Sequence, residues 1–159
     1  MTFREKIDRL LERFVVIIMA VLVIDVLWQV ISRYILSSPS SFTDELAGFL
    51  LIWVGLFGAT YVAGKNEHLA IDLMVQRSGP ARRRFLELFI SGCIVIFSFF
   101  VLVIGGTWLV YTRFALEVKS AALEIPLGYV YIVLPISGLL IIYFTIDNTN
   151  QFLKEHKQN

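Results

Sequence analysis

The sequence predicts an all-α integral membrane protein with four transmembrane helices, and three observations favour this fold class. Hydrophobic residues make up 57% of the 159 residues and charged residues only 17%, whereas soluble domains are about one-quarter charged. The charges cluster between four long apolar runs, each long enough to cross a bilayer as a helix. These runs lack period-two alternation, and strands would leave sheet edges facing lipid. We expect a single membrane domain over residues 1–159, with spans at about 14–36, 43–64, 86–113 and 126–147.

An amphipathic N-terminal helix is expected before the first span. Apolar residues recur at helical spacing from Phe3 to Phe14, and charges fill the opposite face. This pattern is typical of a helix that lies at the membrane surface before turning into a span. The apolar run that follows is longer than the roughly 7–15 residues of a signal-peptide core and contains an acid. We therefore interpret it as a retained span.

The first span carries a polar face formed by Asp25, Gln29 and Arg33. Their i, i+4, i+8 spacing places all three on one side of a helix. An aspartate near a helix centre costs roughly 2.5–3.5 kcal/mol on insertion, so this face meets protein or water. It could line a transport path, bind an ion or contact another protein helix. A contact is favoured because no second membrane-embedded acid completes an ion site, and we predict these residues to be subunit contacts.

Two acids, Asp44 and Glu45, stand at the start of the second span after a short turn. Acids at a helix start suit the helix dipole, and Ser41 or Thr43 would supply the cap. Alternatively, an acid contacts Arg33 and closes the hairpin, or meets a partner chain. The sequence leaves these two interpretations open.

Small residues on the second span predict close packing against a neighbouring helix. Gly55, Ala59 and Ala63 form a small-xxx-small ridge, which lets helix backbones approach each other. We include these three residues among the predicted subunit contacts.

Aromatic residues and prolines mark the last two spans. Trp108 and Tyr111 near the end of the third span are typical of an interfacial belt. Pro126 suits the first helical position of the fourth span. Pro135 lies within that span and is expected to kink it near Tyr131.

Basic residues predict the orientation of the spans. They concentrate in the N-terminal arm, in the loop between the second and third spans and in the tail. The positive-inside rule then places both termini and the middle loop in the cytoplasm. Loops at about 37–43 and 114–125 would face outward.

Several functional classes are disfavoured. A net charge of +1 gives no basis for nucleic-acid binding. The single Cys93 cannot form an internal disulfide or a multi-cysteine metal site, and both histidines lie outside the spans, which argues against a bis-histidine haem. We find no metal cluster, nucleophile–base pair or phosphate-binding loop. We therefore expect no enzyme, no metal and no cofactor.

Three stretches carry a family resemblance: "WQVISRYIL", "FTDELAGFLLIWVGLFGATYVAGKNEHLAIDLM" and "KSAALEIPLGYVYIVLPISG". In order and spacing they resemble the small membrane subunit, DctQ-like, of tripartite ATP-independent periplasmic (TRAP) transporters. The resemblance extends from about Arg4 to Phe152. Its most specific part is the succession of Arg33-Tyr34, Glu45-Leu46, Trp53, Gly58, Gly64, His68, Asp72, Glu124-Ile125-Pro126, Tyr131 and Pro135.

The resemblance implies a function. Such transporters use a sodium gradient to import organic anions such as C4-dicarboxylates, sialic acid or keto sugars into bacteria across the inner membrane. A periplasmic solute-binding protein captures the substrate, and a large permease subunit holds the sodium and substrate sites. The small subunit would scaffold the large one within the membrane lipids. Its outward loops would help to dock the binding protein, and the candidate residues are Asp44, Glu45, Glu117, Lys119 and Glu124.

Two rival interpretations remain. The chain could be a self-sufficient homodimeric exporter that couples transport through Asp25. It could also be a structural or signalling four-helix protein without a transport role.

Overall fold

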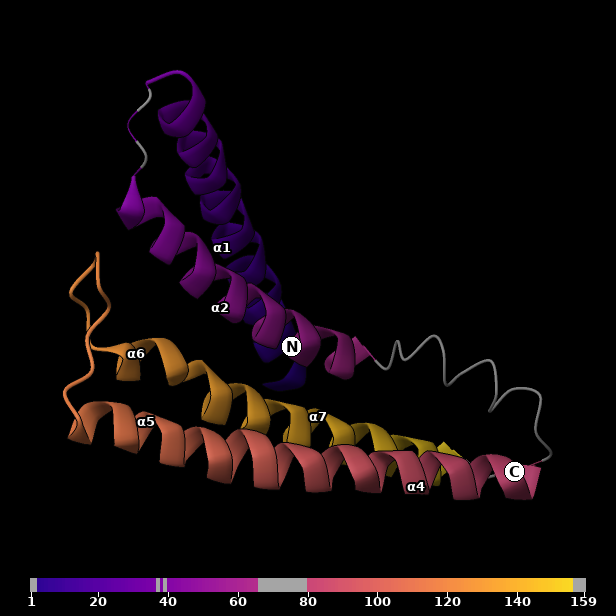
Figure 1. Cartoon of the computed structure of the whole chain (residues 1–159). Helices are drawn as coiled ribbons and strands as arrows, with labels where there is room; N and C mark the ends of the chain where they lie inside the picture. The colour runs from indigo at the N-terminus through magenta and orange to yellow at the C-terminus, as the bar shows by residue number, and fades with distance from the viewer. Residues whose placement is uncertain (1–2, 37, 39, 66–79, 156–159) are drawn as a thin grey trace. The chain divides into compact units, whose positions relative to one another are not determined.

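The structure is a computed structural model that describes residues 3–36, 38, 40–65 and 80–155 (Figure 1). Its helices are α1 (Phe3–Tyr34), α2 (Ser41–Lys65), α4 (Pro80–Phe97), the π-helix η1 (Ser98–Gly105), α5 (Gly106–Ala115), α6 (Leu127–Tyr131) and α7 (Val133–Glu155). Four helical stretches are long and apolar enough to cross a membrane, at Arg4–Tyr34, Ser41–Lys65, Phe85–Ala115 and Leu127–Lys154. The predicted all-α, four-span fold class is confirmed. His68 and Asp72 lie outside the described residues.

The N-terminal arm and the first span form one uninterrupted helix, α1, of 32 residues. The expected turn between a surface helix and the span is wrong. The reason lies in the buried face of α1, where Leu11, Ile18, Asp25 and Ser32 follow one another at intervals of seven residues. Because the buried residues of the arm and those of the span lie on the same face of the helix, one continuous helix buries both sets.

The chain divides into two compact units, described separately here. The first comprises Met1–Gly58 and Trp108–Val133, and the second Ala59–Thr107 and Leu134–Asn159. The division cuts across the spans, so that α2 contributes residues to both units.

In the first unit, aromatic rings join α1 to α2 and α5 to α6. The Phe14 ring of α1 lies edge-on to Phe57 of α2, with centroids 5.3 Å apart. The Phe114 ring of α5 stands edge-on to Tyr129 of α6 at 5.1 Å. A Cβ at Gly128 would lie 2.5 Å from the Phe114 ring, so only glycine admits this contact.

In the second unit, η1 and α4 pack against α7. A Cβ on Gly138 of α7 would come within 2.7 Å of Leu102 Cβ, so the helix backbones approach closely here. Polar side chains also join the helices. Asn148 Nδ2 donates to the Ala63 carbonyl at 2.9 Å, and Thr149 Oγ1 bonds Ser91 Oγ at 3.0 Å.

Two irregularities interrupt the spans. The fourth span breaks at Ile132, between α6 and α7, because Pro135 has no N–H to donate to the Tyr131 carbonyl. The helix is thus interrupted next to Tyr131, and the expected kink stays a prediction. Pro126 is the N-cap of α6 and not its first helical residue as expected, because α6 begins at Leu127. The third span contains the π-helical segment η1, which the sequence did not predict.

Candidate functional site: the loop of residues 116–126 and the Trp53 pocket

The carboxylate of Glu45, in the second turn of α2, holds the loop that joins α5 to α6. Glu45 Oε2 accepts a hydrogen bond from Ser120 Oγ at 2.5 Å. The remaining donors are backbone N–H groups: Ala121 to Oε1 at 2.8 Å, and Ala122 and Leu123 to Oε2 at 2.9 and 3.1 Å. Both carboxylate oxygens are therefore engaged by one short stretch of chain. We call this set of hydrogen bonds the Glu45 clamp.

The clamped loop, residues 116–126, has a defined backbone. Ser120 N–H donates to the Ile125 carbonyl and Leu127 N–H to the Val118 carbonyl, both at 2.9 Å. Two glutamates in the loop have a left-handed backbone conformation, with φ of +48° at Glu117 and +54° at Glu124. Residues other than glycine rarely adopt this conformation, and surrounding structure must hold them there. The Glu45 clamp and the loop's own hydrogen bonds supply that support.

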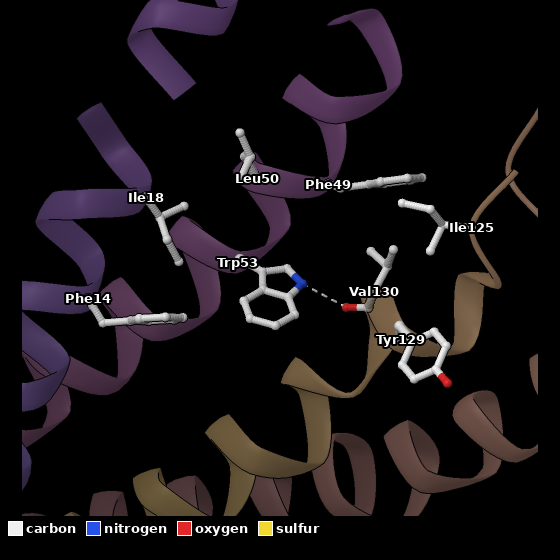
Figure 2. Close-up of a pocket in the computed structure, with 8 residues that line it drawn as sticks. All are labelled: Phe14, Ile18, Phe49, Leu50, Trp53, Ile125, Tyr129 and Val130. Atoms are coloured by element: carbon white, nitrogen blue, oxygen red, sulfur yellow. Dashed lines mark hydrogen bonds between the residues drawn. The ribbon is translucent and has the colours of Figure 1, made fainter. Parts of the chain in front are cut away.

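An apolar pocket of about 350 Å³ lies beside Trp53 in the first unit (Figure 2). Its lining residues come from α1, α2 and the segment around α6: Phe14, Ile18, Phe49, Leu50, Trp53, Ile125, Tyr129 and Val130. Trp53 Nε1 donates to the Val130 carbonyl at 2.9 Å. Because α6 ends at Tyr131, its last carbonyls lack intrahelical donors. The indole N–H satisfies one of these carbonyls and joins α2 to α6.

The predicted polar face of α1 separates into an inner and an outer part. Asp25 is only 7% exposed, and its Oδ2 has no hydrogen-bond partner among the described residues. Gln29 is half-buried. Arg33 lies at the end of the helix, where a guanidinium nitrogen approaches Asp44 Oδ1 at 3.4 Å. The structure thus brings Arg33 and Asp44 together across the hairpin.

The predicted small-residue ridge is divided as well. Gly55 and Ala59 are exposed, and a Cβ placed on Gly55 would meet no atom within 4 Å. Ala63 is buried, and its carbonyl accepts the Asn148 side chain. Gly55 and Ala59 therefore leave an open surface on α2, whereas Ala63 serves contacts inside the chain.

Sequence reasoning missed the partners of Glu45 and Trp53. Ser120 is 75 residues from Glu45, and the Val130 carbonyl is 77 residues from Trp53. One signal was available for Trp53, because a tryptophan within an apolar span carries an N–H that needs an acceptor. No comparable signal identifies the backbone donors to Glu45.

Comparison with known proteins gives a family match over most of the chain. The family described as "Tripartite ATP-independent periplasmic transporters, DctQ component" matches residues 20–155. A Haemophilus influenzae protein, provisionally named a TRAP transporter small permease protein, is 28% identical over 137 residues, which are 85% of this chain and 82% of the relative.

Two further relatives carry substrate names. The C4-dicarboxylate TRAP transporter small permease protein DctQ of Rhodobacter capsulatus is 28% identical over 63% of this chain and 44% of its own length. The sialic acid TRAP transporter small permease protein SiaQ of Vibrio cholerae is 22% identical over 95% of this chain and 86% of its own length.

Proposed function

Because this chain belongs to the DctQ component family of the TRAP transporters, we propose that it is the small permease subunit that scaffolds a large permease subunit. It is a multi-pass protein of the bacterial inner membrane. The transporter would import an organic anion, driven by sodium and supplied by a periplasmic solute-binding protein. The names of the relatives, which refer to C4-dicarboxylates and sialic acid, support this class of substrate.

The main support for the scaffold function is the exposed face of α2 around Gly55. No atom lies within 4 Å of a Cβ built on Gly55. Ala59, one turn further on, is exposed, and so is Leu51, one turn before. Small side chains gain little from contact with lipid, but they let two helix backbones approach closely. A helix of the large permease subunit is therefore the proposed occupant of this face.

The polar contacts inside each unit support the scaffold function, because they hold the helices of this chain together. Trp53 of α2 bonds to the backbone of α6 in the first unit, and Asn148 of α7 bonds to the backbone of α2 in the second. Such hydrogen bonds join the helices of one chain within the apolar interior of a membrane protein. Asp25, Gln29 and Arg33 belong to the same proposed set of contacts. Asp25 is buried, whereas Arg33, in the last turn of α1, is exposed.

We assign the loop of residues 116–126 and the neighbouring Asp44 to the docking of the binding protein. In this orientation, both chain termini lie in the cytoplasm. Glu124 and Asp44 are exposed and carry charge at this end of the molecule. Glu45 acts differently, because four hydrogen bonds from its own chain occupy its carboxylate. Its function is to position the loop, and Glu124 and Asp44 would contact the partner.

The scaffold function is tested by co-purification of the tagged chain from cells that also express the large permease subunit. Gly55→Leu fills the open face of α2 and should abolish recovery of the large subunit in mild detergent. Gly92→Leu is the matched control, because Gly92 of α4 also has no atom within 4 Å of its Cβ position. The control variant should recover the large subunit as the unmodified chain does.

Two results would contradict this function. If the unmodified chain brings down no large membrane protein, the chain is not a small permease subunit. If Gly55→Leu recovers the large subunit as well as Gly92→Leu does, the contact lies elsewhere on the chain.

A further inference from the structure

A second pocket, of about 260 Å³, lies where α5 ends and the clamped loop begins. Its lining residues are Arg113, Phe114, Glu117, Lys119 and Pro126. Two cations and one carboxylate therefore face a small space whose remaining walls are an aromatic ring and a proline ring. We call it the Arg113 pocket.

Within the part of the chain that the structure describes, Arg113 meets an aromatic ring, and no carboxylate pairs with Arg113 or Lys119. The Arg113 guanidinium lies over the Tyr131 ring, 5.9 Å from its centroid. Its Nε is buried and makes no hydrogen bond there. Lys119 and Glu117 also line the pocket, and neither forms an ion pair with another described residue. Two cations against one carboxylate leave the pocket with a local excess of positive charge, which suits an anion.

The backbone at Glu117 has a defined geometry beside the pocket. Glu117 N–H bonds the Phe114 carbonyl and Val118 N–H bonds the Arg113 carbonyl, both at 3.1 Å. These two bonds are those of a Schellman motif, whose left-handed residue is usually glycine. Here that residue is Glu117, at φ +48°. The motif thus defines the backbone at the start of the loop, where Glu117 lines the pocket.

Aromatic residues indicate the depth of the pocket in the membrane. Trp108 and Tyr111, in the preceding turns of α5, are 70% and 66% exposed. Exposed tryptophan and tyrosine at the end of a span lie at the level of the lipid headgroups. Arg113 follows Tyr111 by two residues, a rise of about 3 Å. The pocket therefore lies at headgroup level, where the commonest anion is a lipid phosphate.

We propose that the Arg113 pocket binds the headgroup of a phospholipid. Arg113 and Lys119 donate hydrogen bonds to the phosphodiester oxygens, and Glu117 accepts one from the ammonium group of an ethanolamine headgroup. The rings of Phe114 and Pro126 contact the glycerol and the start of the acyl chains. This assigns Glu117 and Lys119 to the membrane and leaves Glu124 and Asp44 as the docking candidates.

The test is native mass spectrometry of the full chain, purified with any subunit that accompanies it, and titrated with phosphatidylethanolamine or phosphatidylcholine in detergent. Arg113→Gln and Lys119→Gln should each raise the phosphatidylethanolamine concentration for half-occupancy about tenfold, because each removes charge-assisted hydrogen bonds. Arg33→Gln is the matched control. It removes a cation beside Asp44, outside the pocket, and should leave half-occupancy unchanged.

A second pair of variants tests the ammonium contact. Glu117→Gln should abolish the preference for phosphatidylethanolamine over phosphatidylcholine while phosphate binding persists. Glu124→Gln is its control, because Glu124 shares the left-handed backbone and lies in the same loop but does not line the pocket. This variant should keep the preference.

Three results would overturn the proposal. The first is equal loss of lipid in Arg33→Gln and the two pocket variants, which would indicate general electrostatic attraction. The second is unchanged lipid binding in both Arg113→Gln and Lys119→Gln. The third is displacement of the lipid by millimolar inorganic phosphate, which would identify a site for free anions.

Discussion

Ser120 donates its hydroxyl hydrogen to the carboxylate of Glu45 at 2.5 Å, across 75 residues of sequence. Three backbone N–H groups of the same loop converge on this carboxylate. An acid at the start of a helix commonly interacts with the N–H groups of its own first turn. Glu45 instead gathers the donors of another segment, and the loop 116–126 derives its shape from this contact.

Glu45→Gln should loosen the loop without unfolding the helices. The neutral amide keeps the size of the side chain but replaces one acceptor oxygen with an NH₂ donor, so it cannot accept all four hydrogen bonds. Amide hydrogen exchange of residues 121–123 should become faster, whereas exchange within α2 should stay as slow as before. The measurement is hydrogen–deuterium exchange by mass spectrometry.

Asp44→Asn is the control for this experiment, because Asp44 contacts Arg33 and takes no part in the clamp. This variant should leave the exchange of the loop unchanged. Equal protection of the loop in Glu45→Gln and in the unmodified chain would show that other contacts hold it.

Trp53→Phe should lower the stability of the first unit. The change removes the N–H that bonds the Val130 carbonyl at 2.9 Å and leaves that carbonyl without this donor in an apolar setting. The expected loss is about 1 kcal/mol, measured as a lower melting temperature in detergent. Trp28→Phe is the matched control, since Trp28 of α1 is exposed. A similar melting temperature for both variants would mean that the indole hydrogen bond contributes nothing measurable.

Asp25→Asn distinguishes the scaffold function from a self-sufficient exporter. Asparagine preserves the shape of the side chain and removes a buried carboxylate whose Oδ2 lacks a partner among the described residues. A scaffold subunit needs no titratable group here, so substrate uptake by the reconstituted transporter should continue near the unmodified rate. Uptake of the labelled substrate into proteoliposomes is the measurement. Loss of coupled uptake with an intact complex would contradict the scaffold function and favour Asp25 as a coupling residue.

Features that depend on neighbours in sequence could be predicted from the sequence. The four spans followed from runs of apolar residues. The break after Tyr131 followed from Pro135. Proline has no N–H group, so the Tyr131 carbonyl, four residues before it, lacks its helical donor. The Arg33–Asp44 contact was one of two open interpretations, since a short turn brings the end of one span near the start of the next.

Other features were decided only by tertiary packing. The arm and the span form one helix because the buried residues Leu11 and Ile18, seven positions apart, lie on the same helix face. Glu45 and Trp53 form hydrogen bonds with partners 75 and 77 residues away. An apolar segment of sequence does not indicate which distant carbonyl or N–H group will lie beside it in the fold. The amino-acid sequence by itself determined that this chain crosses a membrane four times and that Pro135 interrupts the fourth span, because bilayer thickness and backbone hydrogen bonding act locally. The tertiary structure alone decided which polar groups pair between segments, because such pairs form only where packing brings the segments together.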